Sequence, residues 1–134
     1  MQAGMTKPLI LLIALLLAAC ATAGASTAQI EGSKWTFTQI DGAVPVSGQT
    51  SLEIKSGQID AYLGCNGMGS NLTIAGDKLI VGPMISTQMY CDGVMDQEHA
   101  VSRLLAASPT FKIVDRKLVL QGGDHRAVLQ RTGD

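Results

Sequence analysis

Alternation of apolar and polar residues dominates the chain after residue 30, and it predicts a series of short β-strands. Leu52 and Ile54 alternate with polar neighbours, and 58–63 alternates again after the two-residue turn Ser56-Gly57. Side chains of a strand point alternately to its two faces, so these segments predict a hairpin with one apolar face.

Further short segments carry the same strand signals and are separated by turn residues. The predicted strands, besides that hairpin, are 35–40, 70–75, 78–81, 84–89, 110–114, 117–121 and 126–131, with 44–46 as an extended edge. Short links favour antiparallel neighbours, and a long sheet in a small domain should curl. We therefore predict a mainly β (α+β) fold: a single curled antiparallel sheet or partly closed small barrel of seven to nine short strands.

Residues 92–107 have the spacing of an amphipathic helix instead. Five apolar residues fall near one face of that helix: Val94, Ala100, Val101, Leu104 and Leu105. Asp92 is placed to cap the helix, Asp96 and Glu98 suit its positive N-terminal end, and Ser108-Pro109 ends it. We expect this one packed helix to plug an end of the barrel or cover one face of the sheet.

The first 19 residues have the pattern of a secretory signal peptide. One positive charge, Lys7, precedes an apolar run over 9–17 that is too short to span a bilayer, and Leu17-Ala18-Ala19-Cys20 follows. These four residues resemble the bacterial lipobox, in which the cysteine becomes the acylated first residue. The resemblance implies three acyl chains on Cys20 and a lasting tether to the lipid bilayer. The alternative is an ordinary signal peptide with an incidental cysteine.

The residue after the anchor bears on localisation through the same resemblance. In Gram-negative lipoproteins an Asp at that position favours the inner membrane, so Ala21 implies the outer membrane, facing the periplasm. Residues 21–29 contain no large apolar side chain and predict a flexible tether. We thus expect a signal peptide at 1–19, a lipid-anchored tether at 20–29 and a globular domain at 30–131.

Composition narrows the classes of partner. Without Lys7, nine of the ten basic residues and all eleven acidic residues remain, which gives a net charge of −2. No run of Lys or Arg is present, which argues against nucleic acid as a partner. The five aromatic residues (one Trp, two Tyr, two Phe) are too few to suggest a stacking platform for bases or sugars. The sequence does not fix the oligomeric state, and a monomer is favoured.

Two cysteines, Cys65 and Cys91, remain once Cys20 is assigned to the anchor. In an oxidising compartment such a pair favours a disulfide. The alternatives are two buried free thiols, a metal site or a reactive redox role. Only His99 and His125 could add imidazole ligands, and no C-x-x-C spacing is present. We therefore expect no metal and no cofactor.

No motif for catalysis stands out. No G-x-S-x-G elbow surrounds a serine, and both histidines have the settings of solvated residues, so we expect a protein that is not an enzyme. Gly64-Cys65-Asn66-Gly67 could present N–H groups to an anion, but a tight turn with positive φ is favoured because no Lys or helix start follows. Four methionines could line an adaptable binding surface or simply fill the core: Met68, Met84, Met89 and Met95.

Several of these motifs together resemble the META domain family of HslJ-like heat-inducible lipoproteins. The matching residues, in chain order, are Trp35, Gly64-Cys65-Asn66, Gly69, Met84-x-x-Thr87-x-Met89-x-Cys91, Glu98, Leu104-Leu105, Leu118 and Leu120. Ser70-Asn71 depart from the pattern, because many relatives have an aromatic residue there. The resemblance implies a compact, mainly β domain of the cell envelope.

The same resemblance bears on function. Relatives are linked to the heat response and to tolerance of the antibiotic novobiocin, which implies a role in envelope stress tolerance but no agreed biochemical activity. Since no catalytic set is evident in the sequence, we expect that role to be non-catalytic and to act through binding. Its partner would be an envelope protein or a small molecule. The alternative is an inhibitor of an envelope-acting hydrolase or a carrier of a small apolar ligand.

Overall fold

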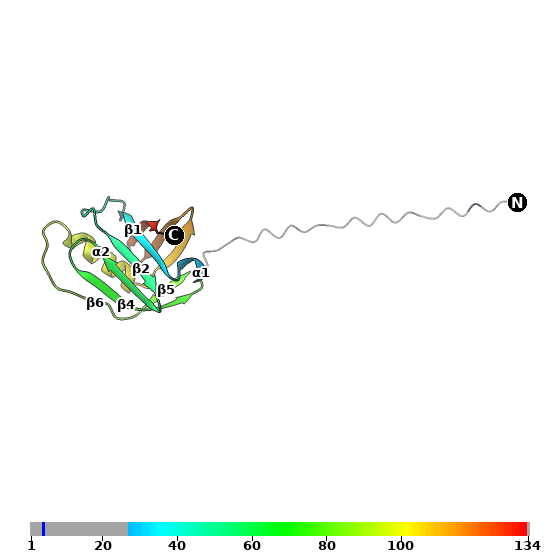
Figure 1. Ribbon diagram of the computed structural model, residues 1–134, viewed down its shortest axis with the longest axis horizontal. Coiled ribbons are helices and arrows are strands. Elements are labelled where there is room, and N and C mark those ends of the chain that lie inside the picture. Colours follow the sequence, from blue (N-terminus) through cyan, green and yellow to red (C-terminus); the bar gives the residue numbers. More distant parts are fainter. Residues whose placement is uncertain (1–3, 5–26, 134) are drawn as a thin grey trace.

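The computed structural model describes Gly4 and residues 27–133, and the second range forms a β-barrel with one main helix (Figure 1). The helices are α1 (Thr27–Ile30) and α2 (Met95–Ala106). The strands are β1 (Ser33–Ile40), β2 (Ser51–Lys55), β3 (Gln58–Tyr62), β4 (Gly67–Ala75), β5 (Lys78–Val81), β6 (Ile85–Ser86), β7 (Thr110–Val114), β8 (Lys117–Gly122) and β9 (His125–Thr132).

Every strand pairs antiparallel with its neighbours. Eight strands follow the order β3-β2-β1-β9-β8-β7-β5-β4, and pairing of β3 with β4 closes the sheet into a barrel. β6 adds to the side of β4 that β5 also occupies, so β5 and β6 lie end to end along β4. The prediction of a small antiparallel barrel with one packed helix is confirmed, and the alternating burial in most strands explains it.

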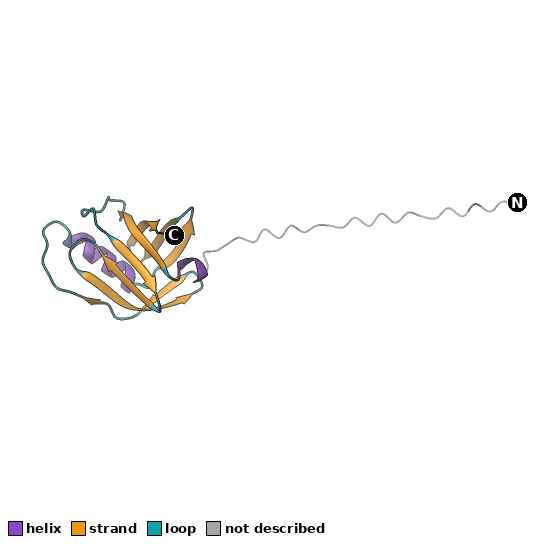
Figure 2. Cartoon of the chain, in the orientation of Figure 1, coloured by secondary structure: helices purple, strands orange, loops and turns teal. Residues whose placement is uncertain are grey.

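Apolar side chains fill the barrel. Trp35, Leu52, Ile54, Leu118 and Leu129 are fully buried and come from four different strands. α2 packs against β1, β5, β8 and β9, which lie on both sides of the barrel, and so covers one of its openings (Figure 2). Its buried apolar residues are Val101, Leu104 and Leu105. The interior is therefore a hydrophobic core made from strands and helix together.

The segment 44–46 is a loop and not the predicted extended edge. Val44 and Val46 are exposed, and their backbone groups bond to the side chain of Gln97 on α2. The Gln97 Nε2 donates to the Val44 carbonyl at 3.0 Å, and its Oε1 accepts from the Val46 amide at 2.8 Å. A helix side chain thus takes the place of a neighbouring strand.

Two other predicted boundaries are corrected. The strand predicted at 84–89 is only β6. The Thr87 amide still donates to the Gly67 carbonyl of β4 at 3.1 Å, but the backbone of Met89 bonds to the Asn66 side chain instead. Asp92 does not cap α2. The N-cap is Val94, whose carbonyl accepts from the Glu98 amide and which makes no side-chain capping bond.

The described domain begins within the segment predicted as a tether. α1 overlaps the tether at residues 27–29, where the Gln29 carbonyl accepts from Arg131 Nη1 at 3.0 Å, and Ile30 is fully buried. The predicted signal peptide, Gly4 apart, and Cys20, the predicted acylation site, lie outside the described residues. No helix in the described ranges combines the length and the apolar character needed to cross a membrane.

Candidate functional site

A buried hydrogen-bond network joins the family-motif residues. Asn66, which lies between β3 and β4, and Glu98 of α2 are almost inaccessible, at 3% and 4% exposed. The Asn66 backbone amide donates to Glu98 Oε2 at 2.7 Å, and its Nδ2 donates to Glu98 Oε1 at 2.9 Å. The buried carboxylate therefore has two donors from one residue, which offsets the cost of removing it from water.

The same asparagine also holds the segment between β6 and α2. Its Oδ1 accepts from Thr87 Oγ1 at 2.9 Å and from the Met89 amide at 2.7 Å, and its Nδ2 donates to the Met89 carbonyl at 2.8 Å. Asn66 thus makes four side-chain hydrogen bonds, the number its amide group can make. The T-x-M part of the motif supplies partners for this one amide group.

A Cys65–Cys91 disulfide fastens the same region covalently. The two Cα atoms are 5.9 Å apart, and the bridge closes a sequence separation of 26 residues. The prediction of this disulfide is confirmed. It lies directly beside Asn66 in sequence, so a covalent bond and a hydrogen-bond network connect the same two loops.

The turn predicted for Gly64-Cys65-Asn66-Gly67 is present at Gly64 only. Gly64 has φ of +111°, and a Cβ there would lie 2.4 Å from the Cβ of Ser47, so only glycine fits. Asn66 and Gly67 have no positive φ. Asn66 serves as the hydrogen-bond centre and Gly67 begins β4.

The sequence reasoning missed the role of Glu98. Glu98 lies in the first turn of α2, as predicted, but the structure also buries it on the face that carries Val101 and Leu105. The signal was present, since 98, 101 and 105 have the spacing of one helix face. An acidic residue on an apolar face indicates a buried carboxylate with partners of its own. With both oxygens engaged, this site is suited to holding loops in place.

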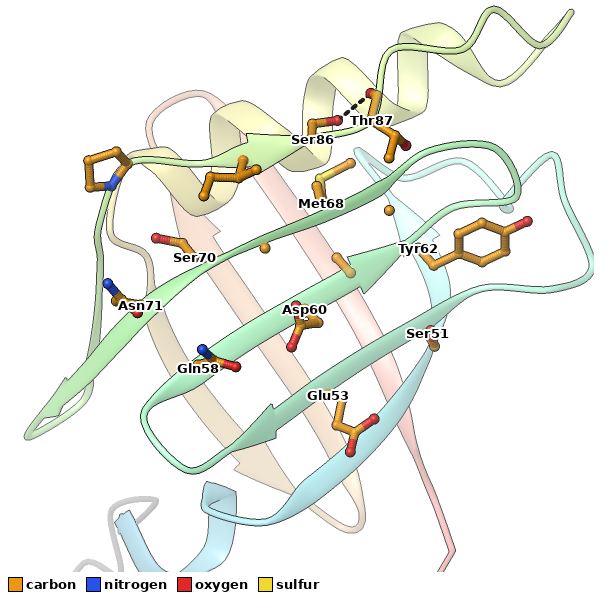
Figure 3. Close-up of a pocket in the computed structure, with 15 residues that line it drawn as sticks. Ser51, Glu53, Gln58, Asp60, Tyr62, Met68, Ser70, Asn71, Ser86 and Thr87 are labelled. Carbon is orange, nitrogen blue, oxygen red and sulfur yellow. Dashed lines mark hydrogen bonds between the residues drawn. The ribbon is translucent and has the colours of Figure 1, made fainter.

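A separate groove of about 520 Å³ crosses the outside of the barrel (Figure 3). It runs over β2, β3 and β4 as far as β6. Residues that define its shape and chemistry are Glu53, Asp60, Tyr62, Gly67, Gly69 and Ile85. Its volume lies within the range of ligand-binding clefts.

Strand register explains the groove. Gly67 and Gly69 are two residues apart on β4, so both face the outside, where they contribute no side chain. Across β3, Tyr62 lies opposite Gly67 and Asp60 lies opposite Gly69. On the other side, Ile85 of β6 pairs with Gly69 and is 78% exposed. The two glycines therefore form a floor between walls of larger side chains.

Two carboxylates dominate the electrostatics of this groove. Glu53 and Asp60 are directly opposite in the β2–β3 register and share the outer face. None of the lining residues is Lys or Arg. Neither carboxylate of the groove makes a salt bridge with another described residue. The salt bridge seen in the described part of the chain joins His125 to Asp41.

A smaller cavity of about 350 Å³ lies between the segment after β6 and helix α2. Three of the four methionines singled out in the sequence line it, Met68, Met89 and Met95, whereas Met84 packs against the core. His99 is exposed at this cavity. The structure thus brings these thioethers to one place beside the Asn66 network.

The second histidine has a different setting. His125 Nδ1 lies 2.7 Å from Asp41 Oδ2, and the Arg126 amide donates to Asp41 Oδ1 at 2.9 Å. Burial raises the pKa of Asp41, but these hydrogen bonds and the charge of His125 outweigh it and hold the pKa below its usual value. The pair joins the turn after β1 to the start of β9.

Comparison with known proteins places this geometry in context. A family model described as META domain matches residues 28–134. No curated protein matches the chain. A protein from Burkholderia xenovorans, solved by NMR, is 14% identical and has a TM-score of 0.64, with 80% of this chain and 86% of that chain covered. A second NMR structure is 12% identical with a TM-score of 0.69, covering 79% and 94%. At these identities the two structures show a shared fold.

Proposed function

Because the chain belongs to the META domain family, we propose that it is an HslJ-like, lipid-anchored protein of the bacterial envelope that acts by binding. The observation that carries this proposal is Leu17-Ala18-Ala19-Cys20 at the end of an apolar run. The Cys65–Cys91 disulfide supports it, because disulfides persist in oxidising compartments such as the periplasm. Because Ala21, and not Asp, follows the proposed anchor, we place the protein at the outer membrane, facing the periplasm.

Binding is favoured over catalysis by the state of the polar groups. The buried Glu98 has both oxygens engaged by Asn66, and His125 is paired with Asp41. The groove offers carboxylates, amides and hydroxyls, a set suited to recognition. Its proposed role is to support envelope tolerance of heat and of antibiotics such as novobiocin by binding an envelope protein or a small molecule.

The alternative of an apolar-ligand carrier finds less support. Side chains fill the barrel, so such a ligand would have to use an outer site such as the methionine-lined cavity. Inhibition of an envelope hydrolase stays compatible with a surface groove. Co-purification of a hydrolase with the membrane-extracted protein would favour that version of the binding role.

The anchor is tested by intact mass of protein extracted from membranes, with thiols alkylated before and after reduction. We expect a chain that starts at Cys20 with a diacylglyceryl-plus-acyl increment, and two further alkyl labels only after reduction. A Cys20→Ala variant should leave the membrane fraction. An unmodified N-terminus with two free thiols would overturn the proposal.

The stress role is tested by deletion and complementation. A deletion strain should lose viability on heating and in novobiocin, and the intact gene should restore both. The Cys20→Ala variant should restore less because its protein is no longer held at the membrane. A deletion that leaves survival unchanged under both conditions would exclude the stress role.

A further inference from the structure

We propose that the groove along β4 binds an extended peptide segment that carries Lys or Arg side chains. This inference rests on the proposed binding function and names the chemistry of its partner. Three features of the described residues support it: a glycine floor that is open at Gly67, an acidic wall without a salt bridge, and exposed side-chain amides without hydrogen-bond partners inside the described domain.

The floor gives the groove its extended shape. Gly67 and Gly69 face outward two residues apart on β4, which spaces them by about 7 Å. A Cβ at Gly69 would lie 2.4 Å from Asp60 Oδ1, so the Asp60 carboxylate leans over the position that a side chain would fill. Figure 3 shows Asp60 between Gln58 and Tyr62 along β3, in line with the groove.

The wall carries two carboxylates that make no salt bridge in the described structure. Glu53 and Asp60 are direct cross-strand neighbours, and like charges in that position destabilise a sheet. Lys34 lies opposite Glu53 on β1, yet no salt bridge forms between them in the described structure. A cationic side chain placed against Asp60 would face both carboxylates, relieve their repulsion and gain Coulomb attraction.

The remaining lining favours a peptide over a bare cation. Gln58 and Asn71 lie opposite each other on β3 and β4, and their side-chain amides are exposed and make no hydrogen bond within the described domain. These groups match the N–H and C=O groups of an extended chain. The exposed Ile85 offers apolar contact beside them.

The test uses the full-length protein extracted in detergent and a dye-labelled peptide, Gly-Lys-Gly-Lys-Gly, blocked at both ends. Fluorescence anisotropy measures its affinity, together with matched peptides in which Gln or Glu replaces both Lys residues. We expect the Lys peptide to bind at least tenfold more tightly than the Gln peptide, and the Glu peptide not to bind.

The decisive variant is E53Q/D60N, which removes both charges and keeps the shapes. We expect it to bind the Lys peptide at least tenfold more weakly while its melting temperature is maintained or raised, because a repulsion is removed. D77N/D124N is the matched control: it removes two charges from exposed turns outside the groove and should bind like the parent protein.

Three results would overturn the inference. Equal loss of binding in both double variants would show general charge attraction, and equal affinity for the Gln peptide would exclude a role for the cation. If spermidine or Ca²⁺ bound as tightly as the Lys peptide, the groove would be a site for free cations and not for a peptide. This test gives a result that is separate from the tests of the proposed function. Acylation and the deletion phenotype could be observed without peptide binding, and peptide binding could be observed without them.

Discussion

Replacing Asn66 by Ala should destabilise the domain more than any other change of an uncharged polar side chain described here. The substitution removes four hydrogen bonds at once: two that Nδ2 donates, to Met89 and Glu98, and two that Oδ1 accepts, from Thr87 and Met89. Because Asn66 and Glu98 are buried, the abandoned groups cannot all turn to water.

The magnitude follows from the character of each bond. Three bonds between neutral groups contribute about 1 kcal/mol each, and the bond to the Glu98 carboxylate contributes about 2 kcal/mol. Neighbouring bonds are not additive, and the backbone amide of residue 66 still donates to Glu98, so the expected loss is about 3–5 kcal/mol. The free energy of unfolding of a domain of this size is about 5–15 kcal/mol, so the expected loss is a large share of it.

Urea unfolding at pH 7, with the disulfide intact, measures the effect. Asn71→Ala is the control, because Asn71 is an exposed asparagine of β4 whose side chain makes no hydrogen bond within the described domain. It should change the free energy of unfolding by less than about 0.5 kcal/mol. A loss below about 1 kcal/mol for Asn66→Ala would refute the view that this amide group holds the two loops and the helix together.

Three further predictions concern stability. Replacing both Cys65 and Cys91 by Ser should cost about 3.5 kcal/mol, the loop-closure entropy for a separation of 26 residues, measured by urea unfolding. Gly64→Ala should cost about 1–3 kcal/mol, because Gly64 has a positive φ and an added Cβ would meet the Ser47 side chain. Gly48→Ala, in open space, should cost far less, and thermal melts of the two variants measure the difference. Asp41→Asn should cost less than about 1 kcal/mol at pH 7, since this carboxylate is 39% exposed, and its effect should fade as the pH drops below about 4.

The sign of the pH effect follows from the direction of the shift. The folded state holds the pKa of Asp41 below its unfolded value, so the stabilisation is present above the unfolded pKa and is lost as pH falls through the folded pKa. An effect of Asp41→Asn that grows as the pH falls below about 4 would contradict this. Equal melting temperatures for the Gly64→Ala and Gly48→Ala variants would contradict the prediction for Gly64. An unchanged free energy of unfolding for the double serine variant would contradict the prediction for the disulfide.

Sequence patterns located most of the secondary structure because the information is local. Alternating residues such as Leu52 and Ile54 mark the strands of a one-sided sheet, and Ser56-Gly57 supplies the positive φ values of the hairpin turn. The α2 pattern located the helix, but not its first residue, because the chain enters it through Val94 without a capping side chain.

Non-local partners account for what the patterns missed. The extended edge at 44–46 did not form because Gln97, far along the chain, binds its backbone groups. The strand at 84–89 ended early because Asn66 binds Met89. In both cases a single side-chain amide replaced a strand neighbour, and local propensity contains no information about such a partner.

The sequence by itself was enough to predict short strands, one main helix and a cysteine pair suited to bridging, and it alone carries the lipobox-like Leu17-Ala18-Ala19-Cys20 on which the proposed anchor rests. Only the tertiary structure decided that Glu98 is buried against Asn66, 32 residues away, and that a groove opens over Gly69. The physical reason is register: pairing of β4 with β3 sets which side chain faces each glycine, and closure of the barrel sets which polar groups lose contact with water.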